Sequence, residues 1–291
     1  TSTTPIDMEE VDGVIVGAGV VGLACAARLA VPGRALVVLE RHPRWGMETS
    51  SRNSEVVHAG LYYPPGSLKS RLCHAGRRAL YRLAEESGVF VKKTGKLVVA
   101  VDPAGAVLLE GLAVKARAAG AEGIELLSGA EACRRVPGLK AEAALWSPET
   151  GIVDSEGLMD HYHAVADAAG AMFLFGTALE TVERNDGAWE LGLASGERLR
   201  ARWVVNAAGL SGDKVAALAG LDIDAAGYRL RWCKGDYFRM KRPPPLPHLV
   251  YPLPSSHGLG VHLTMERGGG VRLGPDTAFV DRLDYAVDPA K

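Results

Sequence analysis

Hydrophobic positions in the first forty residues follow the pattern of a buried β-α-β unit. Residues 12–16 (DGVIV) form a short apolar run typical of a buried strand, and the glycine-rich turn GAGVVG follows at 17–22. Small and apolar residues at 23–30 predict a helix that packs tightly on a sheet, and a Pro-Gly pair ends it. ALVVLE at 35–40 predicts a second buried strand. The whole unit has the expected length of about 30 residues.

Beyond residue 40 the pattern alternates helices with strands and then becomes rich in strands. The predicted helices cover 67–87, 103–119, 128–135 and 155–169. The predicted strands cover 95–101, 172–176, 178–185, 189–195 and 202–209, and residues 144–154 are predicted to form a strand and a turn that lead into the helix at 155–169. After about residue 225, apolar runs around a proline cluster at 243–247 predict an antiparallel sheet with loops. Residues 49–63 are polar, glycine-containing and aromatic, so no core element is expected there. This order predicts an α/β fold, in which a doubly wound, Rossmann-like β-α-β domain is interleaved with a mixed antiparallel-sheet domain.

Composition and charge argue against several classes of protein. The 291 residues are 47% hydrophobic and 23% charged, which is typical of a chain that buries a sizeable core. The formal net charge of -1 provides no global field for nucleic acid, and no basic patch interleaved with aromatic residues occurs. The first eleven residues are polar and acidic, unlike a secretory signal, and the apolar stretch near the start is too short to span a bilayer. We therefore predict a cytoplasmic protein without a nucleic-acid partner, with membrane contact at most peripheral, at the inner membrane.

Neither a metal site nor a disulfide framework is predicted. The four cysteines lie far apart without CxxC spacing, and dispersed thiols suit a reducing compartment. His161 and His163 resemble a pair of metal ligands. However, they lie two apart on a predicted helix, hence on different faces, with no acidic or cysteine partner at ligand spacing. We interpret both histidines as structural.

The turn at 17–22 has the GxGxxG spacing of a dinucleotide-binding site. It follows a predicted strand, opens a helix, and precedes Glu40 at the end of the next strand, which is the context that makes the pattern specific. Gly17 allows the tight turn, Gly19 lets the backbone approach a pyrophosphate, and Gly22 lets the helix lie close to the strands with its positive end facing the phosphates. Glu40 is expected to accept hydrogen bonds from the ribose hydroxyls of adenosine, which disfavours a 2′-phosphate. By itself the turn is compatible with FAD, with NAD, or with a merely structural turn of a doubly wound sheet.

Further motifs run almost from end to end of the chain. They are SSRNSEVVHAGLYY (50–63), PGSLKSRLC (65–73), ETGIVDS (149–155), NAAG (206–209), CKGDYF (233–238), YPLP (251–254) and LGVHLT (259–264). Together they resemble the L-2-hydroxyglutarate dehydrogenase/oxidase family, within the flavoproteins similar to D-amino-acid oxidase. The resemblance implies a two-domain protein with non-covalent FAD that oxidises L-2-hydroxyglutarate to 2-oxoglutarate. We expect an FAD-binding domain at 10–90 and 145–222, and a substrate-binding domain at 91–144 and 223–291.

The resemblance also implies which residues contact FAD. They are Gly17, Gly19, Gly22, Glu40, Arg41, Thr49, Ser50, Ser51, Arg52, Asn53, His58, Leu179, Ala207, Ala208 and Gly209. Residues 49–53 match a loop along the flavin and the pyrophosphate, and Leu179 matches a residue whose backbone meets the adenine. Residues 207–209 match a second glycine-containing turn against the cofactor. Members of the family continue for some tens of residues past the position of Lys291, with FAD-domain strands and an arginine for a substrate carboxylate, so the nucleotide-binding domain is expected to be incomplete.

Oxidation of a 2-hydroxy acid requires a base for the hydroxyl proton, while the α-hydrogen leaves as hydride to flavin N5. A histidine suits this base because its ordinary pKa lies near neutrality. His58 and His262 lie in the motifs that should face the flavin, and each is otherwise a hydrogen-bonded loop or strand residue. We expect one of them to be the base, with a preference for His262.

The substrate is a small dicarboxylic 2-hydroxy acid, so cations and hydrogen-bond donors must meet it. Lys234 and Tyr251 are the candidates, and Lys234 is expected to pair with a carboxylate or to stabilise negative charge near flavin N1. Tyr62 and Tyr63 are candidates for lining the pocket, or simply for packing. Arg52 is expected to bind either a phosphate of the cofactor or the substrate, and the sequence does not choose between them.

Two other functions are compatible with the sequence. The same fold also suits an FAD-dependent amine or amino-acid oxidase, because a fold does not determine chemistry. The chain is also compatible with a non-catalytic nucleotide-binding module. For the electron acceptor, oxygen, a quinone and an electron-transfer protein are all compatible with the sequence.

Overall fold

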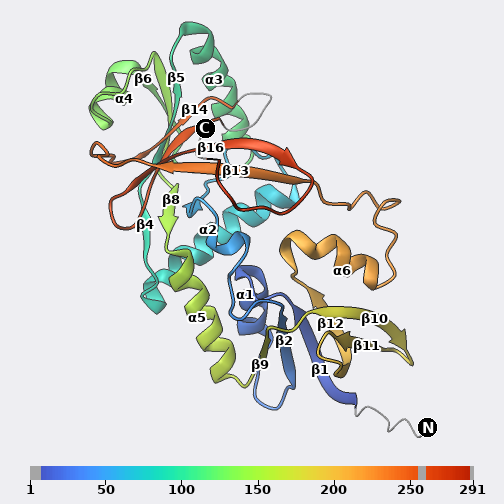
Figure 1. The fold of residues 1–291 in the computed structure, drawn as a ribbon. Helices are drawn as coiled ribbons and strands as arrows, with labels where there is room; N and C mark the ends of the chain where they lie inside the picture. The colour runs from blue at the N-terminus through green and yellow to red at the C-terminus, as the bar shows by residue number, and fades with distance from the viewer. Residues whose placement is uncertain (1–7, 255–259, 289–291) are drawn as a thin grey trace, which may run out of the picture. The chain divides into compact units, whose positions relative to one another are not determined.

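The chain folds into two compact units, each made of two separate stretches of sequence (Figure 1). The computed structural model describes residues 8–254 and 260–288. Unit 1 comprises Thr1–Asn53 and Ser155–Arg231, and unit 2 comprises Ser54–Asp154 and Trp232–Lys291. The predicted interleaving of two domains is therefore present.

Unit 1 is built on a six-stranded sheet with the strand order β10-β11-β12-β1-β2-β9. The strands β12, β1, β2 and β9 pair in parallel, whereas β10, β11 and β12 pair antiparallel. Its elements, in chain order, are β1 (Met8–Val16), α1 (Val20–Leu29), β2 (Leu36–Glu40), η1 (Thr49–Ser51), α5 (Ser155–Ala168), β9 (Met172–Phe175), β10 (Leu179–Asn185), β11 (Ala188–Leu193), β12 (Arg198–Asn206), η2 (Gly209–Ser211) and α6 (Gly212–Leu218). This is the predicted α/β layer.

Apolar side chains of β1 point to both faces of this sheet. On one face Ile15 packs with Leu23 of α1 and Met159 of α5. On the other face Val14 packs in a cluster that includes Val215 of α6. Apolar side chains thus cover both faces, from α1 and α5 on one face and from β11, β12 and α6 on the other. The central parallel strands are therefore buried on both sides, and all five residues of β2 are buried. This explains why the sequence shows continuous apolar runs there instead of alternation.

Unit 2 contains a seven-stranded sheet with the order β13-β16-β15-β14-β5-β7-β6, and a three-stranded sheet with the order β3-β8-β4. In the larger sheet β14 and β5 pair in parallel, and the other neighbours pair antiparallel. Its elements, in chain order, are β3 (Val56–Val57), α2 (Leu68–Ser87), β4 (Val91–Lys93), β5 (Lys96–Ala100), α3 (Pro103–Ala118), β6 (Glu125–Ser128), α4 (Gly129–Arg135), β7 (Ala143–Ser147), β8 (Gly151–Val153), β13 (Trp232–Arg239), β14 (Leu249–Pro252), β15 (His262–Met265) and β16 (Val271–Val280). The larger sheet is therefore mixed, as predicted.

Capping residues define the ends of the predicted helices of unit 2. The Ser67 hydroxyl accepts a hydrogen bond from the Ser70 N–H at the start of α2, and Gly88 ends that helix in the left-handed conformation. At the start of α3 the Asp102 carboxylate accepts from the Gly105 N–H at 2.7 Å. These caps are local in sequence, which is why both helices were predictable.

The boundaries of the two units differ from the predicted domain boundaries. Residues 54–90 belong to unit 2, since β3 pairs with β8. Residues 145–154 also belong to unit 2, because β7 pairs with β5 and β8 pairs with β4. Residues 223–231 belong to unit 1, where the Leu230 N–H donates to Asp213 at 3.1 Å. Periodicity does not reveal which sheet a strand joins when its partner is distant in sequence.

The expectation that residues 49–63 contribute no core element is wrong. Val57, Ala59 and Leu61 are buried, and Leu61 packs in an apolar cluster with Val98 and Leu109. His58 and Gly60 lie between these positions and obscure the apolar pattern in the sequence. The segment therefore contributes to the core of unit 2.

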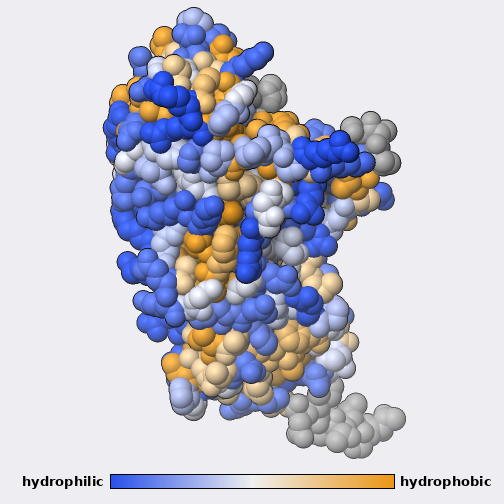
Figure 2. Space-filling view, turned by 90° about the vertical axis from the view of Figure 1, so that its left-hand side faces the viewer, coloured by the Kyte–Doolittle hydropathy of each residue, from blue (hydrophilic) through white to orange (hydrophobic). Residues whose placement is uncertain are grey.

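In the part of the chain that the structure describes, no helix is both long enough and apolar enough to cross a membrane. Figure 2 shows one face of the molecule, where hydrophobic residues form several patches among hydrophilic ones. The exposed apolar residues include Val107, Leu108 and Val114 of α3. Scattered apolar residues of this kind are normal on the surface of a folded protein.

Candidate functional site

The glycine turn between β1 and α1 has the geometry that its sequence predicts. Gly17 has a φ of +103°, which favours glycine, and a Cβ there would lie 2.6 Å from the Ala207 carbonyl oxygen. A Cβ on Gly22 would lie 1.8 Å from the carbonyl oxygen of Gly17. At Gly19 the nearest atom to a Cβ would be the Ser50 hydroxyl oxygen, at 3.0 Å. The first and third glycines are thus needed by the fold, whereas Gly19 leaves open the space in front of the helix.

The N-terminus of α1 provides a site for an anion. The helix begins at Val20, three residues before the predicted start, and its first turn has no acidic side chain. The Ser50 hydroxyl oxygen accepts a hydrogen bond from the Val20 N–H at 3.0 Å. The positive end of the helix dipole and this hydroxyl together favour a diphosphate, so the turn fits the phosphates of the FAD that the sequence implies.

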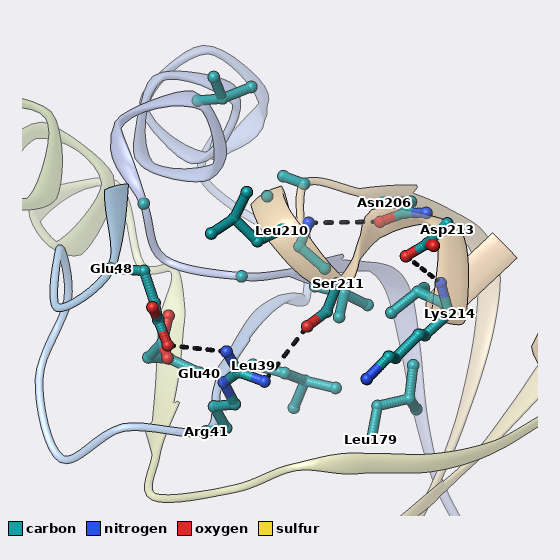
Figure 3. A pocket seen from close by; sticks show the side chains of 18 of the residues that line it. Leu39, Glu40, Arg41, Glu48, Leu179, Asn206, Leu210, Ser211, Asp213 and Lys214 are labelled. Carbon is teal, nitrogen blue, oxygen red and sulfur yellow. Dashed lines mark hydrogen bonds and ion pairs between the residues drawn. The ribbon is translucent and has the colours of Figure 1, made fainter. Parts of the chain in front are cut away.

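A cavity of about 1110 Å³ adjoins this end of the helix, and all the residues that line it belong to unit 1 (Figure 3). Its volume lies slightly above the range of about 300–1,000 Å³ that is usual for ligand pockets, as a large cofactor requires. It lies at the carboxyl ends of β1 and β2, where open α/β sheets bind ligands. The predicted cofactor residues that line it are Gly17, Gly19, Glu40, Arg41, Thr49, Ser50, Leu179, Ala207, Ala208 and Gly209.

Glu40 is held in a fixed position at the end of β2. Its Oε2 accepts a hydrogen bond from the Ala18 N–H, and its Oε1 accepts one from the His42 N–H, both at 2.9 Å. The side chain is buried and lines the cavity. Each carboxylate oxygen has a second lone pair, so Glu40 can accept hydrogen bonds from ribose hydroxyls while keeping both backbone bonds.

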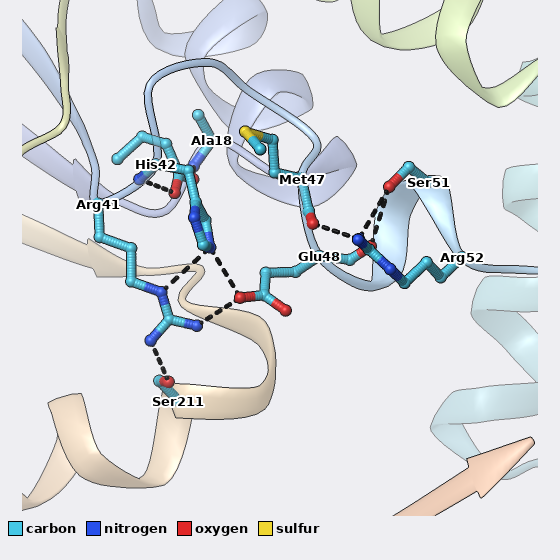
Figure 4. A network of polar contacts seen from close by, with 9 residues as sticks. Ala18, Arg41, His42, Met47, Glu48, Ser51, Arg52 and Ser211 are labelled. Carbon is cyan, nitrogen blue, oxygen red and sulfur yellow. Dashed lines mark hydrogen bonds and ion pairs between the residues drawn. The ribbon is translucent and has the colours of Figure 1, made fainter. Parts of the chain in front are cut away.

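An ion-pair network at the cavity wall connects two loops of unit 1 (Figure 4). Glu48 Oε1 lies 2.7 Å from both Arg41 Nη2 and His42 Nε2. Arg41 Nη1 donates to the Ser211 hydroxyl at 3.2 Å. The network holds the loop after β2 against the turn after β12, so it stabilises the shape of the cavity.

Three of the predicted loop residues do not line the cavity. The Ser51 hydroxyl donates to the Glu48 carbonyl oxygen at 3.2 Å, and Arg52 Nη1 donates to the same oxygen at 3.2 Å. The Asn53 side chain donates to the Ser50 carbonyl oxygen at 2.8 Å. These side chains support the loop that positions Ser50, and their contact with FAD stays a prediction.

Several cavity residues were not identified from the sequence. They are Met47, Glu48, Thr177, Leu210, Ser211, Asp213, Lys214 and Arg229. The Asp213 carboxylate accepts hydrogen bonds from the Lys214 N–H at 2.9 Å and the Leu230 N–H at 3.1 Å. Figure 3 shows Lys214 and Leu179 on the same side of the cavity. The available signal was the run GLSGDK after the strand at 202–209, which forms a second strand-to-helix turn like the first.

Unit 2 contains a second group of reactive side chains. The rings of His262 and Tyr251 stack with their centroids 3.9 Å apart and an interplanar angle of 13°. His262 Nδ1 donates to the Gly260 carbonyl oxygen at 2.9 Å, which leaves Nε2 unprotonated in the neutral ring, 3.5 Å from the Tyr237 hydroxyl. Burial lowers the pKa of His262, the Gly260 carbonyl opposes this, and the charge of Lys96 adds to the lowering. The ring is therefore neutral near pH 7, with Nε2 as a proton acceptor.

Lys96 and His58 belong to the same group. Lys96 is 1% exposed, and its Nζ lies 4.9 Å from the ring centre of Tyr62 and 4.6 Å from that of Tyr251. Burial lowers the pKa of Lys96 to about 7. Burial, and then the charge of Lys96, lowers the pKa of His58 to about 4, so this ring is also neutral near pH 7. The sequence analysis missed Lys96, for which the signal is a lone lysine heading the apolar strand β5.

The structure brings together three of the four predicted catalytic residues, His58, His262 and Tyr251. Lys234 instead donates to the Ala286 carbonyl oxygen, and its Nζ lies 3.9 Å from the Asp236 carboxylate. Among residues 8–254 and 260–288, no hydrogen bond, ion pair or ring contact joins Lys234 to the histidines. Its contact with the substrate stays a prediction, as does the expectation that the histidines face the flavin.

In the described ranges, no three or more His, Cys, Asp or Glu side chains lie where they could hold a metal ion. The ring of His163 packs against Phe173 with centroids 4.4 Å apart, and that of His161 lies 5.7 Å from Tyr162. Both contacts agree with a structural role for the two histidines.

Comparisons with known proteins identify relatives along almost the whole chain. The family model described as FAD dependent oxidoreductase matches residues 12–291. The mitochondrial L-2-hydroxyglutarate dehydrogenases of Arabidopsis thaliana and Caenorhabditis elegans are each 35% identical to this chain, over 98% of it and 68% of their own length. The human enzyme of the same name is 32% identical over 92% of this chain and 61% of its own length.

Solved structures support the same fold. The L-alpha-glycerophosphate oxidase of Mycoplasma pneumoniae, solved with FAD bound, matches 94% of this chain and 73% of its own with a TM-score of 0.86 and 24% identity. The glycine oxidase of Geobacillus kaustophilus matches 97% of this chain and 75% of its own with a TM-score of 0.84 and 22% identity. At such identities the likeness establishes the fold and leaves the substrate open.

Proposed function

The chain belongs to the FAD dependent oxidoreductase family, among the L-2-hydroxyglutarate dehydrogenases, and we propose that it oxidises L-2-hydroxyglutarate, or a similar small 2-hydroxy acid, to the 2-oxo acid. The observation that carries the choice of substrate is the 35% identity to named dehydrogenases over 98% of the chain. FAD is the cofactor, and when bound it accepts the hydride from the carbon that bears the hydroxyl.

The residues of unit 1 suit the binding of this cofactor. The turn at Gly19 and the N-terminus of α1 favour the diphosphate, and the Ser50 hydroxyl lies beside them. The Glu40 carboxylate, fixed by two backbone N–H groups, is suited to the ribose hydroxyls. Binding therefore needs little rearrangement of these side chains, which favours affinity.

The residues of unit 2 suit the removal of the hydroxyl proton. His262 Nε2 is the acceptor, because Nδ1 is committed to the Gly260 carbonyl oxygen. Stacking on the buried Tyr251 ring holds the imidazole in one orientation. His58 is the second candidate, but its lowered pKa, about 4, makes it a weaker base.

A substrate panel tests the proposed reaction. The chain, saturated with FAD, is assayed for dye reduction with L- and D-2-hydroxyglutarate, L-lactate, glycine and L-proline. We expect turnover with L-2-hydroxyglutarate. Turnover with the amines alone would replace the proposal by an amine oxidase, and thermal stabilisation by FAD without any turnover would favour a nucleotide-binding module.

Single-turnover reduction of the flavin tests the base. We expect His262→Gln to slow reduction by about 10²–10⁴-fold, the usual contribution of a general base, and His58→Gln to slow it much less. Equal rates in wild type and both variants would exclude both histidines. A comparison of oxygen consumption with quinone reduction in the same preparation then identifies the electron acceptor. The identity of this acceptor and the cytoplasmic location both stay predictions.

A further inference from the structure

Lys96 is a buried lysine without a carboxylate partner among the described residues, which is unusual. Its side chain is buried, yet among residues 8–254 and 260–288 no carboxylate lies within ion-pair distance of it. Its Nζ instead lies over the rings of Tyr62 and Tyr251, at 4.9 and 4.6 Å from their centres. Buried ammonium groups are normally paired with a carboxylate, because the loss of hydration is costly and two aromatic rings offset only part of it. A buried lysine in such surroundings is a candidate for a function that needs an amine there.

Two further polar atoms of the same region lack a partner. The Tyr62 hydroxyl and the Thr264 hydroxyl are buried, and neither has a hydrogen-bond partner within the described residues. Thr264 lies two residues after His262 on β15, hence on the same face of the strand, and His262 stacks on Tyr251. Within the described part of the chain, two unpartnered hydroxyl donors thus accompany the Lys96 amine, and no carboxylate pairs with that amine.

We propose that Lys96 and the Tyr62 hydroxyl bind a carboxylate of the substrate, so that Lys96 is the cation that selects an anionic 2-hydroxy acid. This assignment rests on the proposed function and supplies the cationic group for which the sequence suggested Lys234. A carboxylate has four lone pairs and can accept from both donors at once. The neutral aromatic walls strengthen the attraction, because they screen it far less than water does.

The protonation of Lys96 provides a readout that a purely structural lysine would not give. The titratable groups that face it are His58, His262, Tyr62, Tyr251 and Cys73. Burial lowers the pKa of both histidines and raises the pKa of both tyrosines and of the thiol, so all five are neutral at pH 8. The pKa of Lys96, lowered to about 7, leaves the amine mostly unprotonated at this pH. An arriving carboxylate favours the ammonium form, so binding should take up about one proton.

Calorimetric titration of the FAD-saturated chain with glutarate, a dicarboxylate that has no hydroxyl to oxidise, tests this. The titration is run at pH 8 in two buffers with different ionisation enthalpies. We expect wild type to take up about one proton and Lys96→Met to bind about 100-fold more weakly, the usual loss for removal of one partner of a buried ion pair. Lys96→Arg, which is always charged, should take up none. The exposed Lys92 supplies the matched control, and Lys92→Met should behave as wild type.

Several outcomes would overturn the assignment. The assignment fails if Lys96→Met binds glutarate as tightly as wild type does. It also fails if wild type takes up no proton on binding, or if wild type does not bind glutarate. If Lys96→Met does not fold, Tyr62→Phe tests the same site, with an expected loss of about tenfold. If glutarate binding depends on Lys96 but no 2-hydroxy acid is oxidised, the proposed function fails and the carboxylate site remains. If L-2-hydroxyglutarate is oxidised equally well by Lys96→Met, the function remains and the carboxylate site fails.

Discussion

Removal of the Lys96 charge should stabilise the fold, and the gain should depend on pH. Lys96 is fully buried, and its pKa falls from 10.5 to about 7 in the folded chain. The folded state therefore binds this proton more weakly than the unfolded state does. The resulting destabilisation is fully present below pH 7 and is lost as the pH rises from about 7 towards 10.5.

The size of this effect follows from the two pKa values. At about 1.4 kcal/mol for each pH unit between them, the destabilisation below pH 7 is on the order of 5 kcal/mol. Between pH 7 and pH 9 about 2 kcal/mol of it should disappear. Lys96→Met keeps the length of the side chain without the charge. The variant should therefore be more stable than wild type by a few kcal/mol at pH 7, and this difference should be about 2 kcal/mol smaller at pH 9.

Urea-induced unfolding, followed by tryptophan fluorescence at pH 7 and pH 9 without substrate, measures both differences. The charge of Lys96 also shifts His58 and His262, but both rings are neutral between pH 7 and pH 9, so the comparison over this range isolates Lys96. Lys92→Met, which alters an exposed lysine of β4, should follow the wild-type profile. Parallel pH profiles for wild type and Lys96→Met would refute the argument, since Lys96 would then have an ordinary pKa.

Three further changes test other parts of the structure. Gly22→Ala should lower the free energy of unfolding by about 2 kcal/mol or more, because its Cβ would lie 1.8 Å from a backbone oxygen; a wild-type melting temperature would contradict this. Glu40→Gln should weaken FAD binding about tenfold in a flavin fluorescence titration, and unchanged affinity would remove Glu40 from the site. Asp102→Ala should cost about 1 kcal/mol in urea unfolding and Asp102→Asn much less, whereas equal losses would show that the cap of α3 is not the cause.

Local sequence was sufficient for much of unit 1. The GxGxxG turn, the strand before it and Glu40 after it lie within about 30 residues, so their geometry depends on short-range sterics and on one helix end. The structure confirms the turn, with Gly17 at φ +103° and Glu40 bonded to Ala18. The wall formed by Asp213 and Lys214 was missed, because it reaches the cavity only through the parallel pairing of β12 with β1.

What the sequence determined by itself was most of the longer helices and strands, the glycine turn after β1 and the family. Each of these depends on neighbours in the chain or on motifs that can be recognised one by one. The tertiary structure alone decided that residues 54–63 join unit 2 and that Lys96 is buried beside Tyr62 and Tyr251. The parallel pairing of β14 with β5 joins segments about 150 residues apart, and no local pattern encodes that contact. Burial and charge depend on such distant contacts, which is why a lysine that is inconspicuous in the sequence has a strongly lowered pKa in the fold.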